Sequence, residues 1–191
     1  MGLQLGLDIS TSNVGWCLLE EDTGKFIDAG ALELSKKKDI FEKSDTVRKA
    51  LKNLGKKYNI NKVGIEENLQ AFRPGFSSAK TIVTLARFNG IVTLLAFEEI
   101  KVRPSFVNVN SARKTVGLKI DRKSTTKTKD QVLEFVQGKV PNYKWPTRTL
   151  KSGPRKGLVL FADSCYDIAD AFVIGKSCVI NGRRTSTEKK S

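Results

Sequence analysis

Hydrophobic and polar positions alternate along the first 34 residues in the way that β-strands require. Apolar runs and alternation predict strands over residues 3–9, 14–20 and 25–34. The polar segment 10–13 joins the first two strands, and Asp-Thr-Gly at 22–24 is a turn-forming sequence between the second and the third. The chain is therefore expected to open with an antiparallel three-stranded meander.

Beyond this meander the apolar positions change to helical spacing. Val47, Leu51 and Leu54 recur at steps of four and three residues among many lysines, which predicts an amphipathic helix over 39–58. The later elements are expected in chain order as a strand over 62–66, a long helix over 77–99, a strand over 103–109, a short helix over 111–116, a helix over 129–136, an insertion loop or hairpin over 141–157 and a last helix over 163–180. Strands mixed with helices in this way indicate the α/β class.

The length of 191 residues fits one domain with a sizeable core. We expect a single domain over residues 1–180 that carries a basic insertion over 139–160, followed by a flexible basic tail over 181–191. No uncharged apolar run approaches ~20 residues, and the first residues lack the pattern of a signal peptide. These observations predict an intracellular protein with no membrane partner.

Basic residues are concentrated in one region of the chain. The sequence holds 34 Lys and Arg against 20 Asp and Glu, a net charge of +14, and residues 101–156 alone hold 15 basic and three acidic residues, a net charge of +12. Such a region favours a polyanion partner whose binding weakens as the salt concentration rises, although a solvated lysine-rich surface is the alternative. Cys17, Cys165 and Cys178 are odd in number and form no Cys-x-x-Cys pair, so we expect reduced structural thiols.

Four acidic residues stand in apolar surroundings where a folding chain would rather have none. Asp8 ends one predicted strand, Glu66 ends another, and Asp167 and Asp170 lie one turn apart in the last helix. Buried carboxylates are normally paired, protonated or bound to a metal. Because the chain has no histidine, its metal ligands would be oxygens, which favour Mg²⁺ or Mn²⁺ over Zn²⁺. If the four acids converge, they would form a pocket for two divalent cations about 4 Å apart.

Each acid also has a purely structural interpretation. Asp8 precedes Ser-Thr-Ser-Asn and could be a turn residue that accepts backbone hydrogen bonds. Glu67 competes with Glu66 because strand alternation allows only one of them on a given face, and we prefer Glu66 because the apolar run ends there. Asp167 and Asp170 could face solvent, but their apolar neighbours argue against a surface position.

The acidic motifs together carry a family resemblance. Their order is Leu-Gly-Leu-Asp-Ile-Ser at 5–10 with a glycine at 15, then Gly-Ile-Glu at 64–66, and last Tyr-Asp-Ile-Ala-Asp-Ala at 166–171. Between them, the helix around 78–90 and the Lys-Asp-Gln-Val sequence at 129–132 continue the match. This arrangement resembles the RuvC-type Holliday junction resolvases of the ribonuclease H superfamily, over roughly residues 3–175.

The resemblance implies a ribonuclease H-like fold, with a five-stranded mixed sheet whose first three strands are antiparallel and which is flanked by helices. It also implies a homodimeric endodeoxyribonuclease that resolves four-way DNA junctions by paired symmetric nicks, uses two Mg²⁺ ions with Mn²⁺ able to substitute, and works wherever its DNA lies. Asp8, Glu66, Asp167 and Asp170 would bind the metal, and Lys129 would lie near the scissile phosphate. Candidate DNA-binding residues are Phe72 or Phe76, which would help to open the junction centre by stacking on a base, together with the basic residues Arg113, Lys114, Lys119, Arg122, Lys123 and Lys127. Either phenylalanine could equally be a core residue.

Two segments depart from the family pattern, and other functions stay open. The loop between Gly117 and Lys129 is longer than in bacterial members, and the insertion over 141–157 has no evident counterpart. The opening Leu-Gly-Leu-Asp motif also resembles the phosphate loop of actin, sugar-kinase and chaperone ATPases, but those proteins need two such lobes. A ribonuclease H-like or YqgF-type ribonuclease would use the same acids on RNA, and a binding module would keep the fold without cleaving.

Overall fold

The computed structural model describes residues 2–67 and 79–188 and has a five-stranded mixed sheet at its centre. The strand order is β3-β2-β1-β4-β5, formed by β1 (Leu3–Ile9), β2 (Asn13–Glu20), β3 (Phe26–Glu33), β4 (Ile60–Glu66) and β5 (Ser105–Val107). The first three strands pair antiparallel, whereas β4 runs parallel to both β1 and β5. This is the ribonuclease H-like arrangement that the sequence predicted.

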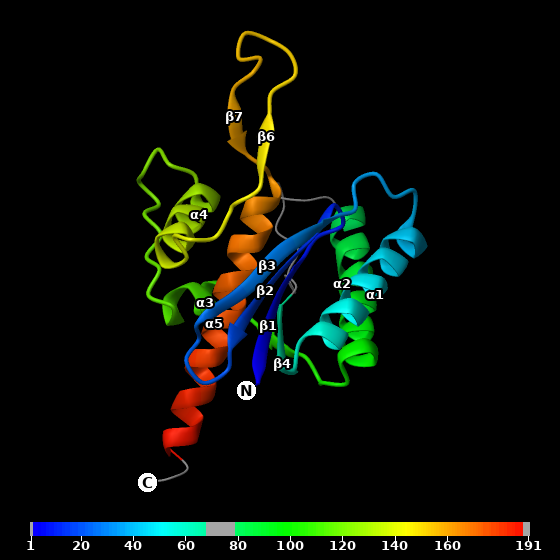
Figure 1. The fold of residues 1–191 in the computed structure, drawn as a ribbon, viewed down its shortest axis with the longest axis vertical. Helices are drawn as coiled ribbons and strands as arrows, with labels where there is room; N and C mark the ends of the chain where they lie inside the picture. Colours follow the sequence, from blue (N-terminus) through cyan, green and yellow to red (C-terminus); the bar gives the residue numbers. More distant parts are fainter. Residues whose placement is uncertain (1, 68–78, 189–191) are drawn as a thin grey trace.

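The helices form two layers, one on each face of the sheet (Figure 1). One layer consists of α1 (Ile40–Lys57) and α2 (Ala79–Ile100), and the other of α3 (Val109–Thr115), α4 (Thr128–Lys139) and α5 (Ser164–Glu188). Each layer has its own hydrophobic cluster. The first is built on Leu5, Leu7 and Val47, and the second on Cys17, Leu19 and Ile168.

Strand β1 shows how the sequence serves both layers. Its odd-numbered side chains Leu3, Leu5, Leu7 and Ile9 are buried in the cluster under α1 and α2. Since successive side chains of a strand point to opposite faces, its even-numbered residues, from position 4 to Asp8, face α5. The apolar run that looked continuous in the sequence is thus an alternation of large apolar residues with small or polar ones.

Side chains that accept backbone hydrogen bonds set the first residues of two helices. Asp39 caps α1, where its Oδ1 accepts from the backbone N–H groups of Phe41 and Glu42, both at 2.9 Å. The short basic helix predicted over 111–116 is α3, which begins two residues earlier because Asn108 accepts from the N–H groups of Asn110 and Ser111. The predicted start of the long helix, at residues 77 and 78, lies outside the described residues.

Two later segments refine the expected outline. The insertion is a hairpin of β6 (Thr147–Thr149) and β7 (Val159–Phe161), which extends past the predicted end of the basic insertion. Helix α5 continues to Glu188, although the sequence placed a flexible tail from residue 181. Arg183 donates to the backbone carbonyl of Asp22 and Thr185 donates to Gly182 O at 3.0 Å, and these contacts hold the polar extension in helical form.

Helix α2 is long and apolar enough to cross a membrane, by length and composition alone, and 28% of its most apolar 18-residue window is buried. Its Phe88 and Val92 lie in the core against the sheet and α1. At its end, Arg48 of α1 forms ion pairs with Glu98 at 3.0 Å and Glu99 at 2.8 Å. One side of α2 therefore packs in the core, while most of this window is exposed.

Candidate metal-binding site of four carboxylates

The parallel strands β1 and β4 each carry a glycine and an acid at matching positions on the face that packs against α5. Gly6 of β1 is in register with Gly64 of β4, so Asp8 and Glu66 follow two residues later at the same edge of the sheet. A methyl group on Gly6 would lie 2.2 Å from the carbonyl oxygen of Ala171 in α5. Only glycine therefore lets α5 cross β1 at this distance and brings the helix close to both acids.

Helix α5 contributes the other two predicted acids through an equally close contact with β2. A Cβ on Gly15 would lie 2.2 Å from the carbonyl oxygen of Asp167 and 2.9 Å from its Cβ. Asp167 is further held by a hydrogen bond from Asn13, and Asp170 follows one turn later. The structure thus brings together all four acids that the sequence singled out.

The carboxyl groups of the two strand acids perturb each other. Burial raises the pKa of Asp8 well above its ordinary value, and the charges of Asp170, Glu66 and Asp167 raise it further. The hydrogen bond between the two carboxyls raises the pKa of Asp8 as well, whereas it opposes the rise that burial causes in the pKa of Glu66. Of the two neighbouring glutamates, it is Glu66 whose carboxyl contacts Asp8. The backbone N–H of Glu67 donates to Val107 O of β5 at 2.9 Å.

The two helix acids differ in their counter-charges. Burial and the neighbouring Asp170 raise the pKa of Asp167 to about 6. Burial also raises the pKa of Asp170, but the guanidinium of Arg113 opposes that rise by an ion pair of 3.2 Å. Arg113 Nε lies buried and has no hydrogen-bond partner among the described residues. The sequence had placed Arg113 on the DNA-binding surface, and the structure places it within the acid cluster.

The four carboxyl groups are close to one another but are not arranged as a metal site. Within residues 2–67 and 79–188, no three Asp, Glu, Cys or His side chains are spaced to hold an ion as they lie. Close carboxylates repel one another, which raises the pKa of Asp8, and Asp170 forms an ion pair with Arg113. The donor set nevertheless consists of oxygens alone, which suits Mg²⁺ or Mn²⁺.

The sequence is similar to those of known proteins over about half of the chain. No family model matches the sequence. The crossover junction endodeoxyribonuclease RuvC of Aliarcobacter butzleri is 33% identical over 97 residues, which cover 50% of this chain and 59% of that protein. The RuvC of Clostridioides difficile is 35% identical over 94 residues, 48% of this chain and 52% of that protein. The chain thus spans little more than half the length of the curated relatives it matches.

Solved structures extend the likeness to the whole fold. RuvC of Thermus thermophilus in complex with a Holliday junction substrate has a TM-score of 0.65 at 15% identity, with 96% of each chain covered. The yeast mitochondrial Holliday junction resolvase has a TM-score of 0.58 at 15% identity, covering 100% of this chain and 85% of that one. The chain is thus similar in sequence to RuvC endonucleases over about half its length, and it shares its fold with RuvC-type resolvases over nearly all of it.

In this RuvC-like fold, Lys129 lies next to the helix turn that carries Asp167, and its closest described partner is an aromatic ring. It is exposed at the start of α4, and its Nζ lies 4.1 Å from the ring centroid of Tyr166, the residue before Asp167. Tyr166 in turn donates to Asp130 at 2.7 Å. The aromatic ring therefore fixes a positive charge next to the first turn of α5.

The remaining predicted DNA-binding residues divide into two groups. Phe72 and Phe76 lie outside the described residues. The basic side chains are all exposed on α3 and on the loop before α4, and they are Lys114, Lys119, Arg122, Lys123 and Lys127. The basic segment therefore remains accessible to a polyanion.

Gln131 organises this basic loop, a role that the sequence did not reveal. Its Nε2 donates to the carbonyl oxygens of Asp121 at 2.9 Å and Thr126 at 2.8 Å, and its Oε1 accepts from the N–H of Asp121 at 2.9 Å. The Lys-Asp-Gln-Val sequence was the available signal. It marked a conspicuous glutamine but could not say which backbone groups that glutamine binds.

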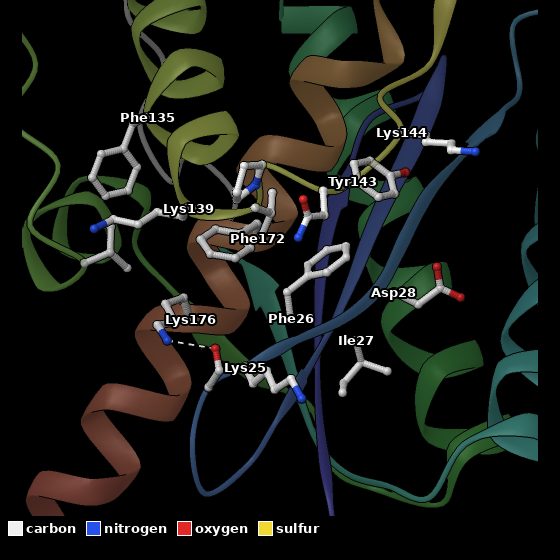
Figure 2. Close-up of a pocket in the computed structure, with 15 residues that line it drawn as sticks. Lys25, Phe26, Ile27, Asp28, Phe135, Lys139, Tyr143, Lys144, Phe172 and Lys176 are labelled. Atoms are coloured by element: carbon white, nitrogen blue, oxygen red, sulfur yellow. Dashed lines mark hydrogen bonds between the residues drawn. The ribbon is translucent and has the colours of Figure 1, made fainter.

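A separate cavity lies between β3, α4 and α5, as Figure 2 shows. Its volume is about 690 Å³, and Phe26, Phe135 and Phe172 line it together with several lysines. One of these, Lys176, donates to the carbonyl oxygen of Gly24 at 2.8 Å. None of the four acids lines the cavity, so it is separate from the candidate metal site.

Proposed function

We propose that this protein is a structure-selective endodeoxyribonuclease that resolves four-way DNA junctions by paired nicks. The convergence of Asp8, Glu66, Asp167 and Asp170 on one edge of a RuvC-like sheet carries this proposal. An acid cluster of this kind has no structural purpose, because its members raise one another's pKa values. A fold that retains them needs a cation, and a cation at a basic surface suits a phosphodiester substrate.

The chain's own groups divide the work at this site. The four carboxylates would hold two Mg²⁺ or Mn²⁺ ions, which would activate water and stabilise the leaving oxygen. Metal binding would favour the ionised form of Asp8 and would compete with the ion pair between Asp170 and Arg113. Arg113 would then be free to donate to the scissile phosphate, and its unpartnered Nε already offers one such donor. Lys129, held over Tyr166, adds a second positive charge.

The proposed enzyme is a homodimer, and the exposed side of α2 supports this part of the proposal. Val83, Leu94 and Phe97 are 47%, 55% and 42% exposed, although the opposite side of the helix is buried in the core. A second copy of the chain would cover this apolar row and present two acid clusters to one junction. Leu94→Asp should then convert a dimer into a monomer in light scattering and leave single, uncoupled nicks.

Cleavage assays on four substrates test the proposal. Purified protein with Mg²⁺ should nick a synthetic four-way junction symmetrically, leaving 5′-phosphate and 3′-hydroxyl ends, and should leave linear duplex and single strands largely intact. Equal cleavage in the presence of EDTA would contradict the metal mechanism. Preferred cleavage of an RNA–DNA hybrid would instead support the ribonuclease H-like or YqgF-type alternative, which uses the same acids.

A further inference from the structure

The β6–β7 hairpin projects beyond the end of the sheet as a two-stranded ribbon (Figure 1). Thr147 pairs with Phe161 and Thr149 with Val159 in an antiparallel register. Its tip is also ordered by hydrogen bonds, since Leu150 and Leu158 are joined at 3.0 Å and Gly157 N–H donates to Leu150 O at 2.9 Å. The sequence foresaw an insertion here but gave it no role.

The base of the hairpin is fixed to the start of α5. The N–H of Ala162 donates to Pro146 O at 3.0 Å, and the thiol of Cys165 donates to the same oxygen at 3.1 Å. Arg148 forms an ion pair of 3.5 Å with Asp163. Strand β7 then leads into α5, whose first turn carries Asp167, so the ribbon and this acid are a few residues apart on one connected unit.

A row of aromatic rings ties the other strand of the ribbon to the sheet. Trp145 packs edge-on against Tyr143 at 5.0 Å between ring centroids, and Tyr143 packs against Phe26 of β3 at 5.3 Å. The Tyr143 hydroxyl also donates to Ala29 O at 3.1 Å. Because an isolated hairpin is only marginally stable in water, these contacts explain how this one keeps a defined direction.

The outer part of the ribbon is strongly basic. Positions 144–162 hold five basic residues and no acidic one, and three of the five lie in the exposed tip: Lys151, Arg155 and Lys156. One face also carries exposed apolar surface, because Val159 is 57% exposed and Phe161 49% exposed beside two threonines. The cations of such a ribbon can bind phosphates, and its apolar and hydroxyl-bearing face can contact base edges. These features together suit DNA better than they suit an apolar partner.

We propose that the β6–β7 hairpin binds the groove of the duplex arm that leads to the scissile strand, with its tip cations on phosphates. The major groove of B-DNA, about 12 Å wide, admits a two-stranded ribbon, and threonine and apolar side chains suit base edges and the thymine methyl group. The anchored base then sets the distance from the bound arm to the four acids. This inference rests on the proposed nuclease function and names the part of the substrate that the insertion recognises.

Charge removal at the tip tests the inference. The triple variant Lys151→Ala, Arg155→Ala and Lys156→Ala should bind a junction and a linear duplex at least about tenfold more weakly at moderate salt. Three lost phosphate contacts should also lower the slope of log K against log salt by about 2 to 3. The matched control is Lys49→Ala, Lys52→Ala and Lys56→Ala on the exposed side of α1, which removes the same charge far from the acids.

The outcomes separate the hairpin from the nuclease proposal. If the tip variant and the control variant have the same affinity and salt slope on both DNAs, the hairpin does not contact DNA and the inference fails, even when the wild type cuts junctions. A loss confined to the four-way junction also overturns it, because the proposed contact is with a duplex arm. If the wild type cuts no junction, the nuclease proposal fails, whereas the duplex-binding comparison still decides whether the hairpin binds DNA.

Discussion

The two faces of the central sheet obey different demands. Toward α1 and α2, strand β1 presents Leu5 and Leu7, which are almost fully buried in a continuous apolar cluster. Toward α5, the same strand presents Gly6 and Asp8, a residue without a side chain and a carboxyl with a raised pKa. The first face stabilises the fold, whereas the second sacrifices packing to bring acids and a helix backbone together.

This contrast shows where stability and chemistry are separated in the molecule. Neighbouring residues of a single strand should respond to substitution in opposite ways, because one contributes apolar burial and the other contributes electrostatic strain. The four acids, Arg113 and Lys129 all belong to the α5 face or to the helices of its layer. The following predictions test that separation.

The sharpest test compares Asp8→Asn with Leu7→Ala. Asp8→Asn should lower metal-dependent cleavage at least about a hundredfold, since metal ions supply several kcal/mol of transition-state stabilisation. Its free energy of unfolding without metal should not fall, because a carboxyl repelled by Asp170 and Asp167 is removed. Leu7→Ala should instead lower the free energy of unfolding by about 2 to 5 kcal/mol, with the loss of a buried side chain.

Single-turnover cleavage and urea unfolding measure the two quantities independently. Junction binding by Asp8→Asn should be unchanged or tighter, because a negative charge near phosphates is gone. If Asp8→Asn unfolds as readily as Leu7→Ala, the proposed division between the two faces is wrong.

Glycine positions give the next largest effect. Gly6→Ala would place a methyl group 2.2 Å from the Ala171 carbonyl oxygen and 2.6 Å from the Gly175 nitrogen, and backbone atoms cannot rotate away. We expect a loss of about 3 kcal/mol or more in stability, with α5 displaced from the acids. Gly138→Ala in α4 is the control, because nothing lies within 4 Å of its Cβ position, and it should stabilise the protein by up to about 1 kcal/mol. Thermal unfolding of both variants provides the measurement.

Much of this separation could be predicted from the sequence, and the reason is periodicity. Strand alternation and helical spacing depend on neighbouring residues, so the pattern could predict β1, β2 and α1. It could also place Asp8 and Glu66 at the ends of their strands. Helix geometry likewise predicts that Asp167 and Asp170, one turn apart, lie on the same face of the helix. Family resemblance supplied the five-stranded mixed sheet, whereas its strand order came from the structure.

The parts that escaped prediction depend on contacts between distant segments. Arg113 looked like one more cation of a basic region, but the packing of α3 against α5 turns it toward Asp170. The close approach at Gly15 depends on Asp167, 152 positions away in the chain. The extension of α5 depends on Arg183 reaching the turn at Asp22. Sequence spacing cannot predict such contacts between residues that are far apart in the chain.

The pH dependence of stability should also distinguish the two faces. Because the folded pKa of Asp167 is about 6 against an ordinary value of 3.8, the folded protein retains a proton that the unfolded chain releases between these pH values. Metal-free wild type should therefore lose stability relative to Asp167→Asn as pH rises from about 4 to 6, by about 1.4 kcal/mol for each pKa unit. Urea unfolding in EDTA at several pH values gives this difference. A difference that stays constant across the window would show that Asp167 is not perturbed by its neighbours.

The smallest effect concerns the basic loop that Gln131 holds in the α5 layer. Gln131→Ala removes bonds to Asp121 and Thr126 on an exposed loop, which should cost about 1 kcal/mol of stability. The lysines of the loop keep their charge, so the salt slope of junction binding should stay unchanged while affinity falls a few-fold through loss of loop order. Gln137→Ala on the same helix is the control. A reduced slope in Gln131→Ala would mean that the glutamine itself lies at the phosphate contact, and the loop would then be part of the recognition surface in its own right.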